Sequence, residues 1–366
     1  MKQLIRFSII TIFCLSLKSI SAQHNKAQIL KEINKIIYYD AQISYEKVPG
    51  FILGVIIGDS TYIYDFGSIE RNSNLTISDS SIFEIGGISK VITSNLAHLL
   101  VKEGVFDYKE PINTYLPQKY RNSSLDITIK DIVTHTTGLP RLPHGIGLKE
   151  KDANNPYAHY SEEDFFEFYK NFRTKHTEKV YQYSHVGFAL LEYAIEHTLN
   201  KDFEDVMIEK LMDPLEMDDT RIDLNESQLK RLSIGHNIIG KKANPWTYKS
   251  FEASVGIKST MIDLLKFSKM QIGINATGLY ENLKETQQAT EHTAIDKNTY
   301  IGLGWHIIKK KHCEVVAHSG STAGHRAFIG MVDNTDTAVV ILSNSENGMS
   351  SLGYLVLKML NNNWKK

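Results

Sequence analysis

The sequence predicts an α+β fold in which one antiparallel sheet is built from both ends of the chain and flanked by helices. A hairpin pattern lies near the start, several strand patterns lie near the end, and the block between them is helical without a strong strand pattern. The helical block is then an insertion. This predicts a sheet lobe from residues 23–105 and 250–366 and a helical lobe from residues 106–249.

Composition and the N-terminus narrow the class of protein. The chain has 366 residues, 42% of them hydrophobic, and a net charge of −1, which gives no argument for a nucleic-acid partner. Residues 1–22 have the charged start, short apolar run and small-residue end of a secretory signal peptide. Because the apolar run is too short to span a bilayer comfortably, we expect a secreted or periplasmic protein with no membrane span after cleavage. Cys313 is then the only cysteine of the mature chain, which excludes an internal disulfide.

The first part of the chain predicts a helix followed by a hairpin. Residues 27–43 place isoleucines on one helical face, and Pro49-Gly50 ends that pattern. Residues 51–57 and 61–66 read as two strands joined by a turn at residues 58–60. A polar loop covers residues 71–81. An extended entry at Phe83 and a glycine turn then lead into a buried helix that runs to Leu100.

The later elements follow in the same way. Helices are expected at residues 161–172, with Ser161 as N-cap, at 186–199, and at 203–211, ending before Pro214. Ser259-Thr260 caps a helix at 261–271. Strands are expected at residues 301–308, 313–317, 327–332 and 338–343, and a closing helix at 350–360.

The buried helix carries the chemistry. Lys90 lies in its first turn, where a buried ammonium is costly without a partner. Residues three apart share a helix face, so Lys90 faces position 87. This is the arrangement of a Ser-x-x-Lys site, in which lysine takes the proton of a serine hydroxyl, but position 87 is Gly87. Ser89 lies on another face and is expected to pack or cap locally.

Residues 83–90, Phe-Glu-Ile-Gly-Gly-Ile-Ser-Lys, resemble the nucleophile motif of the serine beta-lactamase and penicillin-binding-protein superfamily, in its class C and esterase-like branch. Gly87 stands where that motif has serine. Residues 134–140, 214–220 and 302–305 resemble further family segments in the family's order. The resemblance covers nearly all of the mature chain and implies the beta-lactamase/transpeptidase-like two-lobed fold. His135, within the first of these segments, is expected to be structural.

The resemblance also implies a second motif at Tyr183-Ser184-His185, where the family has Tyr-x-Asn. Residues i and i+2 of an extended segment point the same way, so Tyr183 and His185 are both expected to face the cleft. Tyr183 would be the general base, with a pKa lowered by Lys90. His185 replaces the amide by a larger group that can act as a base.

The third motif is His318-Ser319-Gly320-Ser321, similar to the family's histidine-x-glycine strand. By resemblance, the N–H groups of residue 87 and Ser321 form the oxyanion hole, and His318 supplies a donor or a positive charge for a substrate carboxylate. Gly320 would let a ligand backbone approach the strand edge. The expected ligand is a small molecule or peptide: a beta-lactam, a D-Ala peptide or an ester. No metal-ligand spacing or phosphate-binding glycine loop is present, so we expect no metal and no cofactor.

Three functional hypotheses follow. The first is a secreted protein of this fold that cannot form an acyl-enzyme and binds its ligand in the retained cleft. The second is an active serine hydrolase whose natural residue 87 is serine. The third is hydrolysis by a water activated by Lys90, Tyr183 and His185.

Overall fold

The computed structural model describes residues 26–41, 43–44, 46–146, 155–174, 179–274 and 276–361. The chain divides into a short N-terminal unit, of which residues 26–41 are described, and a large unit from Ile43 onward. The predicted signal peptide lies outside the described residues. No helix in the described part of the chain is both long enough and apolar enough to cross a bilayer.

In the N-terminal unit, helix α2 (Lys26–Lys35) continues into a π-helical turn, Ile36–Asp40. The predicted isoleucine face is buried, at Ile29, Ile33, Ile36 and Ile37. The helix predicted to reach residue 43 therefore ends earlier as an α-helix. The N–H of Ala41 donates to the carbonyl of Ile36 at 2.8 Å, which is the wider spacing of a π turn.

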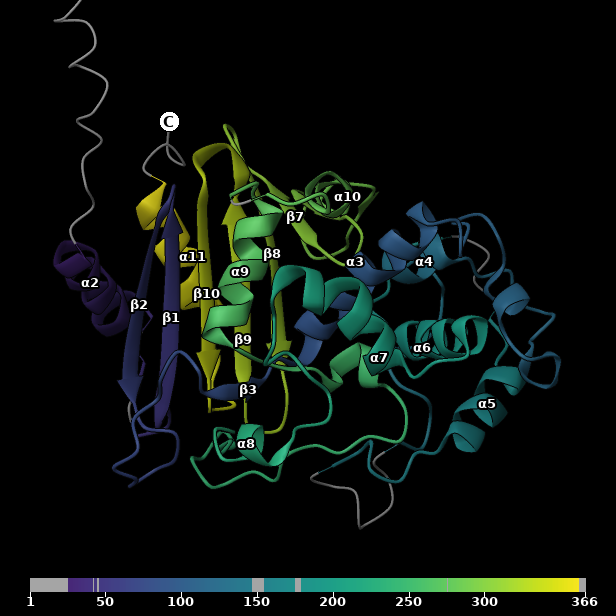
Figure 1. Ribbon diagram of the computed structural model, residues 1–366, viewed down its shortest axis with the longest axis horizontal. Helices are drawn as coiled ribbons and strands as arrows, with labels where there is room; N and C mark the ends of the chain where they lie inside the picture. Colours follow the sequence, from purple (N-terminus) through teal and green to yellow (C-terminus); the bar gives the residue numbers. More distant parts are fainter. Residues whose placement is uncertain are drawn as a thin grey trace, which may run out of the picture. The chain divides into compact units, whose positions relative to one another are not determined.

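The large unit is built on one eight-stranded antiparallel sheet in the order β2-β1-β10-β9-β8-β7-β6-β5 (Figure 1). The N-terminal hairpin pairs with the last strand, with Phe51 opposite Ser343 and Ile57 opposite Thr337. The prediction of one sheet made from both ends of the chain is confirmed. The strands are β1 (Gly50–Ile57), β2 (Ser60–Gly67), β5 (Glu291–His292), β6 (Thr299–Ile301), β7 (His306–Lys309), β8 (Glu314–Ser321), β9 (Arg326–Val332) and β10 (Thr337–Ser343).

Helices cover both faces of the sheet. Helix α9 (Met261–Gln271) packs on β1 and β10, and a Cβ placed on Gly54 would lie 2.5 Å from the sulfur of Met261. Helix α11 (Ser350–Leu360) packs on β9 and β10 from the other face, where a Cβ on Gly330 would lie 2.7 Å from Leu357. Neighbouring residues of a strand face opposite sides of the sheet. Because helices pack on both sides, the residues on both faces are apolar, and the central strands are buried along their length.

The remaining helices come mainly from the middle of the chain, and the described residues 106–249 contribute no strand to either sheet. The capped helix at 161–172, the helix at 186–199 and the helix at 261–271 are confirmed, while the helix predicted at 203–211 changes to a π turn after Met207. The division into two lobes stays a prediction. The helices are α3 (Ser89–Lys102), α4 (Ile129–Val133), α5 (Glu162–Asn171), α6 (Val186–Leu199), α7 (Phe203–Met207), α8 (Glu226–Leu229) and α10 (Tyr280–Glu285).

The strand predicted at residues 301–308 is wrong. The structure has a hairpin there, with β6 and β7 joined by a turn at residues 302–305. Gly304 has φ +78°, which favours glycine, and the N–H of Gly302 donates to the carbonyl of Trp305 at 2.8 Å. A second, two-stranded sheet, which was not predicted, pairs β3 (Ile82–Glu84) with β4 (Lys258–Thr260).

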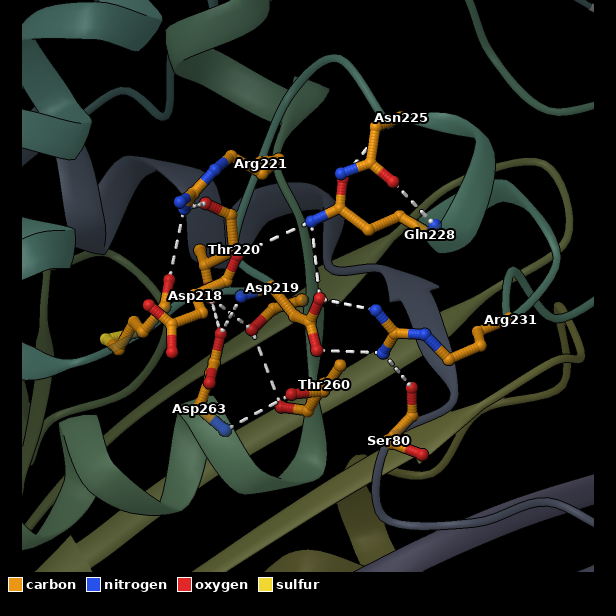
Figure 2. A network of polar contacts seen from close by, with 12 residues as sticks. Ser80, Asp218, Asp219, Thr220, Arg221, Asn225, Gln228, Arg231, Thr260 and Asp263 are labelled. Atoms are coloured by element: carbon orange, nitrogen blue, oxygen red, sulfur yellow. Dashed lines mark hydrogen bonds and ion pairs between the residues drawn. The ribbon is translucent and has the colours of Figure 1, made fainter.

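A polar network fixes the loop that precedes α8 to the start of α9 (Figure 2). The carboxylate of Asp263 accepts the N–H of Asp219 at 2.9 Å and the hydroxyl of Thr220 at 2.8 Å, and the hydroxyl of Thr260 caps the helix. Arg231 contacts both carboxylate oxygens of Asp219 and donates to the carbonyl of Ser80 at 2.8 Å. The network thereby joins this loop to the segment that enters β3.

We expect Asp263→Ala to lower the free energy of unfolding by about 2 to 3 kcal/mol, because two donors lose their acceptor in a buried position. Denaturant titration measures this. The exposed Asp205→Ala serves as the control and is expected to change stability by less than about 0.5 kcal/mol. Equal effects of the two substitutions would show that the network does not stabilise the fold.

Candidate functional site

The first motif turns sharply between β3 and α3. Gly86 has φ +51°, and a 3-10 turn at Gly86–Ile88 leads into the helix, so Lys90 projects from its first turn. The hydroxyl of Ser89 accepts the N–H of Ile257 at 3.2 Å. The expected local cap is therefore not formed: the Ser89 hydroxyl contacts the backbone of a distant segment, and Ser89 does not line the cavity described below.

Lys90 is fully buried. Its amine donates to the carbonyl of Ser254 at 2.8 Å and lies 4.9 Å from the ring centroid of Tyr183 and 5.8 Å from that of Phe188. Burial, together with the charge of Arg141, holds the pKa of Lys90 well below its ordinary value. A lowered pKa favours the neutral amine, which is a base, but the side-chain hydrogen bond that Lys90 makes with the described residues goes to a backbone carbonyl.

The second motif is held by the turn at residues 134–140. The N–H of Ser184 donates to Nδ1 of His135 at 3.2 Å, and the N–H of Gln182 donates to the carbonyl of His135 at 2.7 Å. The ring of His135 packs against Tyr183 with centroids 4.5 Å apart. These contacts agree with the structural role predicted for His135.

The structure does not support the lowered pKa expected for Tyr183. Burial, and then the neighbouring phenol of Tyr181, raise the pKa of Tyr183 above its ordinary value. The charge of Arg141 acts in the opposite direction but does not outweigh burial. Tyr183 is therefore a neutral phenol, able to donate or accept a hydrogen bond.

His185 lines the same cavity as Tyr183, as the two-residue spacing predicted. Its N–H donates to the carbonyl of Arg141 at 2.9 Å, and its Nδ1 lies 3.3 Å from the hydroxyl of Tyr157. Its Nε2 is buried without a hydrogen-bond partner among the described residues. Burial, with the charge of Lys90 as the next cause, holds the pKa of His185 well below its ordinary value.

The third motif lies on β8, where that strand extends past β7. The pairing of β7 with β8 begins at His306 opposite Ala317, so β7 does not pair with residues 318–321. The Gly86–Ile88 turn packs against this part of β8. A Cβ on Gly320 would lie 1.8 Å from the carbonyl oxygen of Ile85. Gly320 does permit a close backbone approach, but the approaching backbone belongs to this chain and not to a ligand.

His318 cannot supply the positive charge expected of it. The side chain is 3% exposed, and burial, with His306 and Lys90 as further causes, holds its pKa well below the ordinary value. Its Nδ1 lies 2.9 Å from the carbonyl oxygen of Ser319, so the N–H is on Nδ1. Nε2 of the neutral ring is then an acceptor, and it has no partner among the described residues.

These residues surround a cavity of about 400 Å³. The predicted residues Gly87, Tyr183, His185, His318 and Ser321 line it, while Lys90 lies buried beneath Tyr183. Sequence reasoning missed several lining residues, although the alternating Tyr181, Tyr183, His185 pattern could have revealed the first of them. The residues missed are Tyr181, Arg141, Ile295, His306 and Tyr354.

Gly87 has little free space around its Cα. A Cβ at this position would lie 2.9 Å from the carbonyl oxygen of Ser319, 2.9 Å from the hydroxyl of Tyr183 and 3.2 Å from a ring carbon of His318. Real Cβ atoms essentially never approach closer than 3.0 Å, so a side chain would require its neighbours to move. No group of three or more metal-ligating side chains occurs among the described residues.

Comparison with known proteins gives a consistent result. Residues 38–357 match the family model described as Beta-lactamase. A beta-lactamase of Providencia stuartii is 26% identical over 287 residues, which is 77% of this chain and 68% of that protein. The D-alanyl-D-alanine-carboxypeptidase/endopeptidase AmpH of Escherichia coli is 22% identical over 310 residues, covering 80% and 78% of the two chains.

Solved structures agree in fold. A class C beta-lactamase from Rhodobacter sphaeroides superposes with a TM-score of 0.77 at 19% identity, covering 93% of this chain and 99% of that one. A beta-lactamase/D-alanine carboxypeptidase from Yersinia pestis gives a TM-score of 0.78 at 20% identity, with the same coverage. The α+β fold predicted from the sequence is confirmed.

Proposed function

Because the chain belongs to the beta-lactamase family but has Gly87 at the position of the nucleophile, we propose that it is a non-acylating member. It binds a peptide- or acyl-type ligand without forming a covalent bond. The observation that carries this proposal is that Gly87 lines the cavity without a side chain, while the buried amine of Lys90 donates to the carbonyl of Ser254.

The crowding at position 87 supports the same proposal. The space that a serine side chain needs is approached by the Ser319 carbonyl, the Tyr183 hydroxyl and the His318 ring. The neutral phenol of Tyr183 and the neutral imidazoles of His185 and His318 can still orient a ligand by hydrogen bonds. The remaining chemistry of the site is therefore binding, with the N–H groups of Gly87 and Ser321 proposed to hold a ligand carbonyl.

The relatives indicate which ligands to try. Beta-lactamases and a D-alanyl-D-alanine carboxypeptidase are among them, so the ligand is proposed to be a small molecule or peptide: a beta-lactam, a D-Ala peptide or an ester. The N-terminal pattern supports a secreted or periplasmic location, where such compounds occur.

The purified protein is expected to show no burst with a chromogenic cephalosporin or a p-nitrophenyl ester, and no mass increase after incubation with penicillin or a fluorophosphonate. Loss of a catalytic nucleophile typically lowers kcat by about 10⁶. Intact-mass spectrometry measures the adduct directly, and a serine beta-lactamase serves as the positive control. A stable adduct on any serine of this chain would refute the proposal.

One observation favours a second candidate, hydrolysis by an activated water. His185 lines the cavity, is uncharged at neutral pH and has an unpartnered Nε2, so it can act as a base beside Lys90 and Tyr183. This route predicts slow turnover without any adduct, and loss of that turnover in His185→Asn. Unchanged turnover in that variant would exclude it.

A further inference from the structure

Arg141 lines the cavity, and its backbone is held by the second motif. Its carbonyl accepts the N–H of His185 at 2.9 Å, and the preceding carbonyl, of Pro140, accepts the hydroxyl of Ser184 at 2.8 Å. The guanidinium carbon lies 5.5 Å from the ring centroid of Tyr183, a cation–π distance. The side chain is therefore directed over the ring that forms one wall of the site.

The charge of Arg141 is available to a ligand. The residue is exposed, lines the cavity, and makes no ion pair or side-chain hydrogen bond with the described residues. No aspartate or glutamate is among the described residues that line the cavity. A guanidinium is always protonated in proteins. The positive charge of Arg141 is one of the causes that lower the pKa values of Lys90 and His185. The cavity therefore carries one lasting positive charge and no compensating negative one among its described residues.

The third motif predicted that His318 recognises a ligand carboxylate, but His318 is buried and uncharged. Nε2 of His318 is an acceptor without a partner among the described residues, so a ligand could donate a hydrogen bond to it. The guanidinium of Arg141 would bind an anion, and a planar carboxylate can accept two parallel hydrogen bonds from it. A ligand with both a carboxylate and an amide N–H satisfies the two groups.

We propose that Arg141, in place of His318, recognises the carboxylate of the ligand, and that the site selects carboxylate-bearing amides over neutral ones. The inference rests on the proposed function, because it specifies the charge of the ligand that the non-acylating cavity binds. Arg141 then determines the specificity for charged over neutral ligands. His318 orients the ligand by accepting a hydrogen bond from the ligand's amide N–H.

The experiment compares N-benzoylglycine with its neutral amide, N-benzoylglycinamide, by isothermal titration calorimetry on the full chain. The two probes share shape and the amide N–H and differ in charge. The unsubstituted protein is expected to bind the acid more tightly, by about tenfold or more, since a hydrogen bond to a charged group contributes about 1.5 to 3 kcal/mol. Arg141→Gln is expected to remove that preference without changing affinity for the amide. Arg173→Gln, an exposed arginine outside this cavity, is the control and should keep the preference.

Two results would overturn the proposal. One is an unsubstituted protein that does not bind the acid more tightly than the amide, including one that binds neither. The other is an Arg141→Gln variant, folded by circular dichroism, that keeps the preference, which would place the anion site elsewhere. Both results differ from failure of the proposed function, which would appear as a covalent adduct in mass spectrometry whatever the charge of the ligand.

Discussion

Replacing Gly87 by serine is expected to lower the free energy of unfolding by about 1 to 3 kcal/mol and not to restore rapid acylation. The new Cβ would lie 2.9 Å from the Ser319 carbonyl oxygen and from the Tyr183 hydroxyl, and overpacking of a buried position has a cost of this size. Moving Tyr183 to make room would also displace the group that should relay the proton. Denaturant titration and the rate of fluorophosphonate labelling measure the two effects.

Gly87→Ala is the matched control, since it adds the same Cβ without the hydroxyl. Both variants are expected to lose similar stability, and neither should react quickly. The contrary outcome is a serine variant that is as stable as the unsubstituted protein and is labelled within seconds. The chain would then be an intact serine hydrolase scaffold that lacks only the hydroxymethyl side chain of serine, as expected if the natural residue 87 is serine.

A second large effect is expected in mild acid. His185 is 5% exposed and has a strongly lowered pKa in the folded state, whereas an unfolded histidine titrates near 6.5. Below pH 6.5 the unfolded chain binds a proton that the folded chain does not. The free energy of unfolding therefore falls as the pH is lowered from 6.5 toward the pKa of the folded state. The groups that influence this imidazole are Lys90, His135, Arg141 and His318, all of which disfavour its protonation, with Tyr157 and Tyr183 as uncharged neighbours.

His185→Asn should remove this contribution. Between pH 7.5 and pH 5, the unsubstituted protein is expected to lose more free energy of unfolding than the variant does, by at most about 1.4 kcal/mol for each pH unit below 6.5. Denaturant titrations at the two pH values give the difference. The exposed His312→Gln is the control and should behave like the unsubstituted protein. Equal acid sensitivity of all three proteins would mean that His185 is protonated in the folded state.

Local signals accounted for much of the fold. The N-caps at Ser161 and Thr260, the continuous apolar run of β1 and the alternation of β2 each act within a few residues, so the sequence predicts them directly. The turn at Gly304 was missed because a positive φ is a property of the folded backbone, and an apolar run on both sides of it looks like one strand. The β3–β4 pair was missed because its strands are short and far apart in the chain.

The sequence predicted which side chains gather at the site but not their protonation states. The motif spacings brought Gly87, Tyr183, His185 and His318 to one cavity. The protonation states depend on burial by residues from other elements, so the expected effect of Lys90 on Tyr183 and the expected charge on His318 were wrong. The exposure of Arg141 likewise depends on how its loop is held by Ser184 and His185.

The pairing of β1 with β10 has a consequence for how the protein is made. A ribosome must complete synthesis beyond Ser343 before Phe51 can meet its partner, so the first hairpin leaves the exit tunnel with one edge open. The hairpin of β1 and β2 therefore joins the rest of the sheet late, and a chain truncated before residue 337 would leave that edge open and be prone to aggregate.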